Sequence, residues 1–230
     1  MSDRDHVLAN LEDVRARIAR AAERSGRDPA DVTIVAATKL VPVEPIRWVI
    51  DGGVTSIGEN YVQELRAKRS EIEGARWHYI GTLRSGSATE VADAADVVET
   101  VAGERASRRL AGRAARAGRS LDTLIEIDFT GERAGVAPEE ASAFADLVAG
   151  LEGLRLVGVM TIPPLADDPE GSRPWFARLR HLRDRIRDRH PGVVETSMGM
   201  SLDYEVAVEE GATMVRIGTA LFGPRPTGGA

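Results

Sequence analysis

The feature that most constrains the fold of this chain is a regular alternation of short apolar runs with longer amphipathic segments. Most of the amphipathic segments end near a glycine, as helices commonly do. These glycines are Gly52, Gly74, Gly118, Gly150, Gly192 and Gly211. Eight runs rich in β-branched or apolar residues are predicted as strands. They are residues 32–38, 55–58, 77–81, 97–101, 123–129, 156–160, 193–197 and 214–218.

These eight strand–helix units predict an α/β fold. Residues 32–37 and 154–160 are apolar almost without interruption, which favours strands buried on both faces of a parallel sheet. Eight units within 230 residues predict a single closed (β/α)8 TIM barrel. An open doubly wound sheet is the alternative, because strand number alone does not exclude it.

One domain is expected over residues 1–230. Apolar residues spaced three and four apart from Val7 to Ala22 predict an additional N-terminal helix that ends near Gly26, so residues 1–30 would form this helix and its lead-in. The long irregular stretch over residues 161–173 follows the sixth predicted strand, and we expect it to be a loop at the barrel rim.

Composition excludes several classes of site and partner. The absence of cysteine excludes disulfides, thiolate nucleophiles, iron–sulfur clusters and sulfur-ligated zinc, and four histidines leave little for another metal site. The net charge of −6 argues against general nucleic-acid binding. Neither a signal peptide nor a run of roughly 20 apolar residues is found, so we expect a cytoplasmic protein without a membrane partner.

Arginines gather in two predicted helices, at residues 105–116 and 178–189. Their spacing follows helix faces, and the second cluster is interleaved with Asp184 and Asp188. We interpret both clusters as solvated, ion-paired helix surfaces rather than nucleic-acid sites.

Lys39 is the strongest candidate for a residue with a chemical function. In a TIM barrel the working residues lie after the strands, and Lys39 follows the first predicted strand. It is one of only two lysines among 30 basic residues, so an amine rather than a guanidinium is favoured at this position. Such an amine can lose its proton and form a Schiff base. The alternative is a lysine whose charged end reaches solvent from a strand end.

The segments after strands seven and eight point to a phosphate site, which barrels often build there from backbone amides. The candidates are Ser201, Gly218 and Thr219. Ser201 could instead be a helix N-cap, and Gly218 a position of close packing. An amine opposite a phosphate site suits a phosphorylated aldehyde, and pyridoxal 5′-phosphate (PLP) is the obvious such cofactor. No P-loop or dinucleotide glycine motif competes with it.

Several segments resemble the pyridoxal phosphate homeostasis protein family, the YggS/PROSC type, in order along nearly the whole chain. They are Ala-Thr-Lys (37–39), Gly-Glu-Asn-Tyr-Val-Gln-Glu (58–64), Trp-His-Tyr-Ile-Gly (77–81), Met-Thr-Ile-Pro (160–163), Ser-Met-Gly-Met-Ser-Leu-Asp (197–203) and Arg-Ile-Gly-Thr-Ala-Leu-Phe-Gly (216–223). Residues 81–87 depart from the Gly-Pro-Leu-Gln-x-Asn-Lys pattern of many relatives, and residues 128–135 match only loosely.

The resemblance implies a fold-type III PLP-binding barrel like the N-terminal domain of alanine racemase. It implies that Lys39 carries PLP as a Schiff base and that Arg216 faces the pyridine nitrogen. It also implies that Ser201, Gly218 and Thr219 hold the phosphate, and that Asn60 and His78 line the ring pocket.

Arg216 would disfavour protonation of the pyridine ring and weaken it as an electron sink. A racemase also takes a second base from another domain, which we do not expect here because the chain stops soon after the eighth unit. We therefore predict a PLP homeostasis protein without catalytic residues, acting as a monomer, with PLP-dependent apo-enzymes as candidate partners. A weak PLP-dependent amino-acid racemase and a cofactor-free Schiff-base aldolase are the alternatives.

Overall fold

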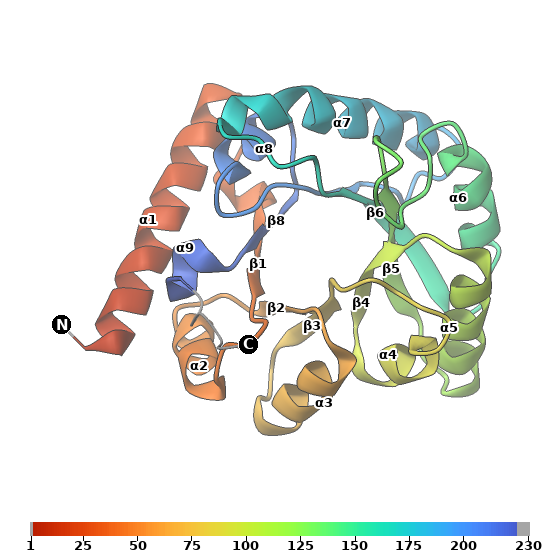
Figure 1. Ribbon diagram of the computed structural model, residues 1–230, viewed down its shortest axis with the longest axis horizontal. Coiled ribbons are helices and arrows are strands. Elements are labelled where there is room, and N and C mark those ends of the chain that lie inside the picture. Colours follow the sequence, from red (N-terminus) through yellow and green to blue (C-terminus); the bar gives the residue numbers. More distant parts are fainter. Residues whose placement is uncertain (1, 225–230) are drawn as a thin grey trace.

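The computed structural model describes residues 2–224 and contains a closed barrel of eight parallel strands, each paired with its neighbours in chain order (Figure 1). Residues 33–36 of β1 pair with residues 214–217 of β8, which closes the ring. The predicted TIM barrel is confirmed, and the open doubly wound sheet is wrong. Met1 and residues 225–230, part of the domain predicted over 1–230, lie outside the described residues. The strands are β1 (Thr33–Ala37), β2 (Ser56–Glu59), β3 (Arg76–Tyr79), β4 (Val97–Val101), β5 (Leu121–Ile127), β6 (Leu154–Thr161), β7 (Glu195–Ser197) and β8 (Met214–Ile217).

The strands lie close to their predicted positions, with ends that differ by at most two residues. The fifth strand shows why: it was predicted to continue to Phe129 but ends at Ile127. The carboxylate of Asp128 accepts hydrogen bonds from the amides of Thr130, Gly131 and Arg133, and this turns the chain away from the ladder. The pattern of apolar residues in the sequence does not show where a side chain accepts hydrogen bonds from backbone amides.

Helices surround the barrel (Figure 1). The predicted N-terminal helix is α1; it lies outside the ring against α8, α9 and α2. Within residues 2–224, no helix is both long and apolar enough to cross a membrane. The predicted rim loop is irregular apart from a short 3-10 helix at Pro169–Ser172. The α-helices are α1 (Asp3–Arg24), α2 (Val43–Asp51), α3 (Val62–Glu71), α4 (Ala88–Ala94), α5 (Glu104–Arg116), α6 (Ala141–Ala149), α7 (Arg173–Arg187), α8 (Tyr204–Glu209) and α9 (Thr219–Phe222).

The barrel interior is filled in layers. A small apolar cluster takes its side chains from five strands: Val35, Val97, Leu124, Met160 and Met214. Because strand side chains alternate, the residues two positions further along point into the same interior. In β4, β5 and β8 these are Glu99, Glu126 and Arg216, so an apolar plug is followed by a polar layer below the barrel mouth.

Candidate functional site

Lys39 lies at the barrel mouth, two residues beyond the end of β1. Its Nζ is 5.0 Å from the centroid of the Tyr61 ring. The side chain is half-buried and lines a cavity together with Asn60, Tyr61 and Tyr79, rather than extending freely into solvent. Among residues 2–224 the amine has no hydrogen-bonding or ion-pairing partner. It is therefore free to react with a carbonyl group that enters the mouth.

The Ser201 side chain is hydrogen-bonded to the start of α9 and does not cap α8. The N-cap of α8 is Asp203, so the interpretation of Ser201 as a helix cap is wrong. The Ser201 hydroxyl instead accepts hydrogen bonds from the backbone amides of Gly218 (3.4 Å) and Ala220 (3.1 Å). The structure thus brings the predicted phosphate residues together, with Thr219 as the first residue of α9.

Gly218 connects this group to β1. A Cβ at this position would lie 3.2 Å from the carbonyl oxygen of Ala37, so a side chain would crowd the end of β1. The close-packing interpretation of Gly218 therefore holds alongside the phosphate interpretation. Because Ala37 is two residues before Lys39, the Ser201 group and the Lys39 amine come from adjoining strands at one end of the barrel.

Arg216 is buried in the polar layer. Its Nη1 donates to Ser197 Oγ (2.6 Å) and its Nη2 to the carbonyl oxygen of Thr161 (2.9 Å). Burial lowers the pKa of the guanidinium, while the carboxylates of Glu99 and Glu126 act in the opposite direction. Arginine remains a cation even so. The barrel therefore holds a fixed positive charge inside its mouth.

His78 belongs to the same buried network, through two residues that sequence reasoning did not assign to the site. His78 Nδ1 lies 2.7 Å from Glu99 Oε1, and Ser197 Oγ donates to Glu99 Oε2 at 2.6 Å. Among the described residues, the buried Nε2 of His78 has no partner. The sequence does contain a sign that Glu99 is a site residue, because it is the single acidic residue inside the apolar run Val-Val-Glu-Thr-Val.

The pKa of Glu99 reflects this network. Burial by itself would raise the pKa of the carboxyl group. The hydrogen bond and charge of His78, the charge of Arg216 and the hydrogen bond from Ser197 together outweigh burial and lower it. Glu99 is therefore an anion that balances Arg216, whose Nη1 lies 3.9 Å from Glu99 Oε2.

Asn60 immediately follows β2 and lies against Gly81, which follows β3. Its backbone amide donates to Glu59 Oε2 (3.2 Å), and within residues 2–224 its side-chain amide has no hydrogen-bond partner. A Cβ on Gly81 would lie only 1.9 Å from the carbonyl oxygen of Asn60. The glycine is thus needed to let the backbone carry Asn60 to the mouth.

The two loops that depart from the family pattern have different structural roles. Residues 82–87 border the Lys39 cavity through Thr82, Arg84 and Ser87. In residues 128–135, the Asp128 carboxylate organises the chain by accepting backbone hydrogen bonds.

The two arginine clusters lie on outer helices, away from Lys39. In the second, four arginines are ion-paired as predicted, whereas Arg178 and Arg185 have no ion pair among residues 2–224; the paired residues are Arg180, Arg183, Arg187 and Arg189. In the first, Arg108 pairs with Glu104 and Arg113 with Asp93.

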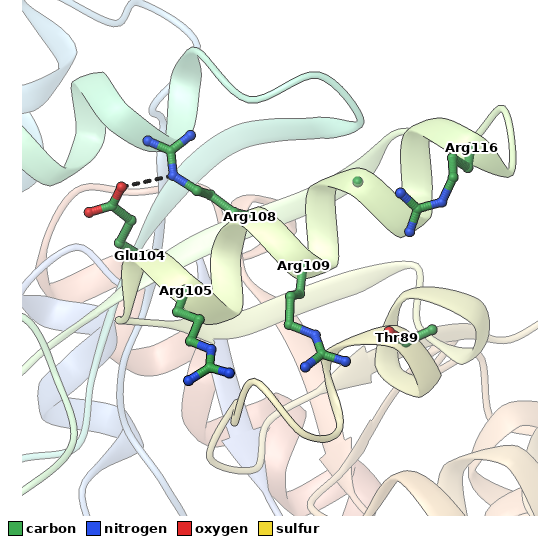
Figure 2. A pocket seen from close by; sticks show the side chains of 7 residues that line it. Thr89, Glu104, Arg105, Arg108, Arg109 and Arg116 are labelled. Atoms are coloured by element: carbon green, nitrogen blue, oxygen red, sulfur yellow. Dashed lines mark hydrogen bonds and ion pairs between the residues drawn. The ribbon is translucent and has the colours of Figure 1, made fainter.

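Three other arginines of the first cluster are exposed to solvent, as predicted, but within residues 2–224 they are not ion-paired. Arg105, Arg109 and Arg116 have no ion pair among the residues described. Figure 2 shows Arg105 and Arg109 extending from the same side of α5, beside a cavity of about 720 Å³.

Comparison with known proteins identifies the family. A family model described as the alanine racemase N-terminal domain matches residues 7–226. The pyridoxal phosphate homeostasis protein of Pseudomonas aeruginosa is 38% identical over 226 residues, covering 96% of this chain and 97% of that protein. That of Aquifex aeolicus is 37% identical over 225 residues, covering 96% and 99%. This chain belongs to the pyridoxal phosphate homeostasis protein family. The resemblance seen in the sequence is confirmed.

Solved structures agree with this family membership. A protein of Bifidobacterium adolescentis described as unknown has a TM-score of 0.90 and 31% identity, covering 96% of each chain. PipY of Synechococcus elongatus, solved with PLP bound, has a TM-score of 0.84 and 29% identity, covering 94% of this chain and 100% of PipY. An alanine racemase of Clostridium difficile is similar in fold, with a TM-score of 0.78 and 18% identity, covering 97% of this chain and 58% of the racemase.

Proposed function

We propose that the protein binds PLP as a Schiff base on Lys39 and serves PLP homeostasis in the cytoplasm. The observation that carries this proposal is the amine of Lys39 at the barrel mouth, which has no hydrogen-bond or ion-pair partner among residues 2–224 and follows the strand adjoining the group formed by Ser201, Gly218 and Ala220. The names of the relatives and the PLP bound to PipY support it.

The residues present suit such a ligand. In this proposal the Ser201 hydroxyl, with Gly218 and Thr219, binds the phosphate, since hydroxyls and exposed backbone amides are suitable donors to an anion. Arg216 faces the pyridine nitrogen, held by Ser197 and Thr161. Asn60 and His78 contribute to the ring pocket, and each has a side-chain nitrogen without a partner among the described residues.

We further propose that the protein has little catalytic activity of its own. PLP supplies an aldehyde that an amine captures reversibly, and a ring that accepts electrons best when its nitrogen is protonated. The buried cation of Arg216 disfavours that protonation. The protein would therefore keep a reactive aldehyde tethered, and PLP-dependent apo-enzymes are its proposed recipients.

The first prediction tests the lysine assignment. Purified protein loaded with PLP should be yellow, and borohydride should fix the cofactor to the peptide that contains Lys39. Lys39→Ala should be colourless, because it removes the amine while Lys68 is engaged by other groups. Absorbance and peptide mass spectrometry measure both effects. Full yellow occupancy in Lys39→Ala would show that the assignment is wrong.

Two further measurements test the homeostasis role. Loaded protein is mixed with an apo-enzyme in the presence of a trap for free aldehydes; transfer that persists supports direct delivery, whereas complete suppression contradicts it. Exchange of an amino acid's α-proton with deuterated solvent, together with loss of optical activity, would instead show a racemase.

A further inference from the structure

The second of the two lysines, Lys68, lies beneath the turn that carries the first. Lys68 is on α3 and is 7% exposed. Its ammonium donates to the carbonyl oxygen of Thr38 (2.7 Å), to Glu59 Oε1 (2.5 Å) and to Glu64 Oε2 (2.9 Å). An ammonium has three hydrogens to donate, so all of them are used. Lys68 therefore binds the residue that immediately precedes Lys39.

The turn after Lys39 has an unfavourable backbone conformation. Leu40 has φ of 62° and is the one non-glycine residue with positive φ among residues 2–224. This conformation is unfavourable for a residue with a Cβ, and Leu40 is 57% exposed, so core packing does not offset the cost. Such a conformation persists only where surrounding contacts impose it.

The contacts that impose it involve the acceptors that Lys68 binds. The Leu40 amide donates to Glu64 Oε2 at 3.0 Å, and the Val41 amide donates to the Thr38 carbonyl oxygen at 2.9 Å. Lys68 donates to both of these oxygen atoms. One ammonium thus holds the acceptors on the two sides of Lys39.

Glu59 ties the same network to β2. Its Oε1 accepts hydrogen bonds from Lys68 and from the Thr38 hydroxyl (2.6 Å), and its Oε2 accepts from the Asn60 amide. Burial raises the pKa of Glu59, and the hydrogen bonds from Lys68 and Thr38 act against that effect. The network therefore fixes the backbone at Thr38 and at Asn60, on two neighbouring strands.

We propose that Lys68 is a positioning residue for Lys39. It fixes the Thr38–Leu40 turn so that the Lys39 amine already lies where a phosphate-anchored aldehyde reaches it. This inference rests on the proposed function, since it concerns capture of the same ligand. A simple helix-surface pair between Lys68 and Glu64 would not require the ammonium to reach the carbonyl of Thr38.

A positioned Lys39 amine should capture anchored aldehydes faster without capturing free aldehydes faster. In both cases a C–N bond forms between the amine and the carbonyl carbon, and the carbonyl oxygen leaves as water. A fixed amine accelerates this reaction only when the aldehyde is also held, because the gain comes from proximity and orientation. A small aldehyde that diffuses freely gains nothing from the turn.

The test uses a matched set of variants in the cofactor-free protein. Lys68→Met removes the ammonium, and Glu64→Ala removes the acceptor for the Leu40 amide. Glu64→Gln keeps a carbonyl oxygen as acceptor and is the conservative variant. Arg66→Met is the control on the same helix, because Arg66 pairs with Glu90 on the surface.

Three quantities are measured for each variant. Two are rates: capture of PLP by Lys39, and methylation of Lys39 by formaldehyde with cyanoborohydride. The third is the affinity for pyridoxine 5′-phosphate, which has no aldehyde. We expect at least a tenfold slower capture of PLP in Lys68→Met and Glu64→Ala. We expect pyridoxine 5′-phosphate affinity to stay within twofold and formaldehyde labelling not to slow. Glu64→Gln and Arg66→Met should behave like the wild type.

Wild-type capture rates in both Lys68→Met and Glu64→Ala would overturn the positioning role. Equal losses of PLP capture and of pyridoxine 5′-phosphate affinity would also overturn it, because they indicate a general collapse of the site. A wild-type protein that captures PLP no faster than phosphate-free pyridoxal would contradict the proposed function itself. Failure of the positioning role would therefore be seen in the variants, whereas failure of the proposed function would be seen in the wild-type protein.

Discussion

At the scale of single residues, the two lysines of the chain occupy one structural unit. Lys39 was predicted as an amine at a strand end, and the structure places it at the barrel mouth over the Tyr61 ring, without a hydrogen-bond or ion-pair partner in the part of the chain that is described. The sequence analysis assigned no role to Lys68. Its burial against Thr38 depends on contacts across 30 residues of chain, which no local pattern encodes.

Gly81 gives a prediction at this scale. Gly81→Ala would place a methyl group 1.9 Å from the carbonyl oxygen of Asn60, which the backbone of β2 and β3 can relieve only by moving apart. We expect a loss of about 3 kcal/mol in the free energy of unfolding. Chemical denaturation measures this loss.

Gly86→Ala in the same loop is the control, because nothing lies within 4 Å of its added Cβ. Its effect should stay within about 0.5 kcal/mol. Equal stability of the two variants would contradict the close approach at Gly81.

At the scale of elements, the strands position the site through alternation. In β4 and β8, Val97 and Met214 belong to the apolar plug, and the next inward residues, Glu99 and Arg216, form a polar layer. The predicted strands located these residues correctly along the chain. Which charges meet across the barrel is decided by closure of the sheet, so the link from His78 through Glu99 to Ser197 was not predicted.

The buried network around Glu99 can be tested by a single substitution. Glu99→Gln leaves the buried cation of Arg216 without its nearest counter-charge and breaks a network that joins β3, β4, β7 and β8. We expect a loss of about 3 kcal/mol in unfolding free energy, measured by chemical denaturation. The same change at exposed Glu104 should cost less than about 0.5 kcal/mol. Indistinguishable effects would show that Glu99 carries no buried charge.

At the scale of the whole molecule, the carboxyl groups divide into two sets with opposite effects on stability. Burial raises the pKa values of Glu59 and Glu126 above the ordinary range. Hydrogen bonds and neighbouring charges outweigh burial and lower the pKa values of Glu64, Glu99 and Asp128. The two sets predict a stability maximum between their titrations.

The sign of each contribution sets the pH profile. The groups with lowered pKa stabilise the fold above their unfolded pKa, which is about 4, and this contribution is lost as the pH falls further. The groups with raised pKa stabilise it below about pH 4.3, and their contribution is lost as the pH rises through the folded pKa. We therefore expect Tm to be highest at mildly acidic pH and to drop steeply below about pH 4.

Thermal unfolding between pH 3 and pH 8 checks this profile. Glu126→Gln removes a group with raised pKa and should flatten the decline of Tm toward neutral pH. A Tm that rises continuously from mildly acidic pH to pH 8 would contradict the assignment of Glu59 and Glu126.

Sequence alone was enough to predict the eight strand–helix units, their order and the end of the strands at which the candidate site lies, because hydrophobic periodicity and the scarcity of lysine are local properties; closure of the sheet was seen only in the structure. It also placed Ser201, Gly218 and Thr219 after the strands that bring them together. Tertiary structure alone decided the partners of the buried charges: Glu99 with His78 and Arg216, and Lys68 with Thr38. The physical reason is that a buried charge is stable only when groups from distant segments surround it, and those segments meet only when the barrel closes.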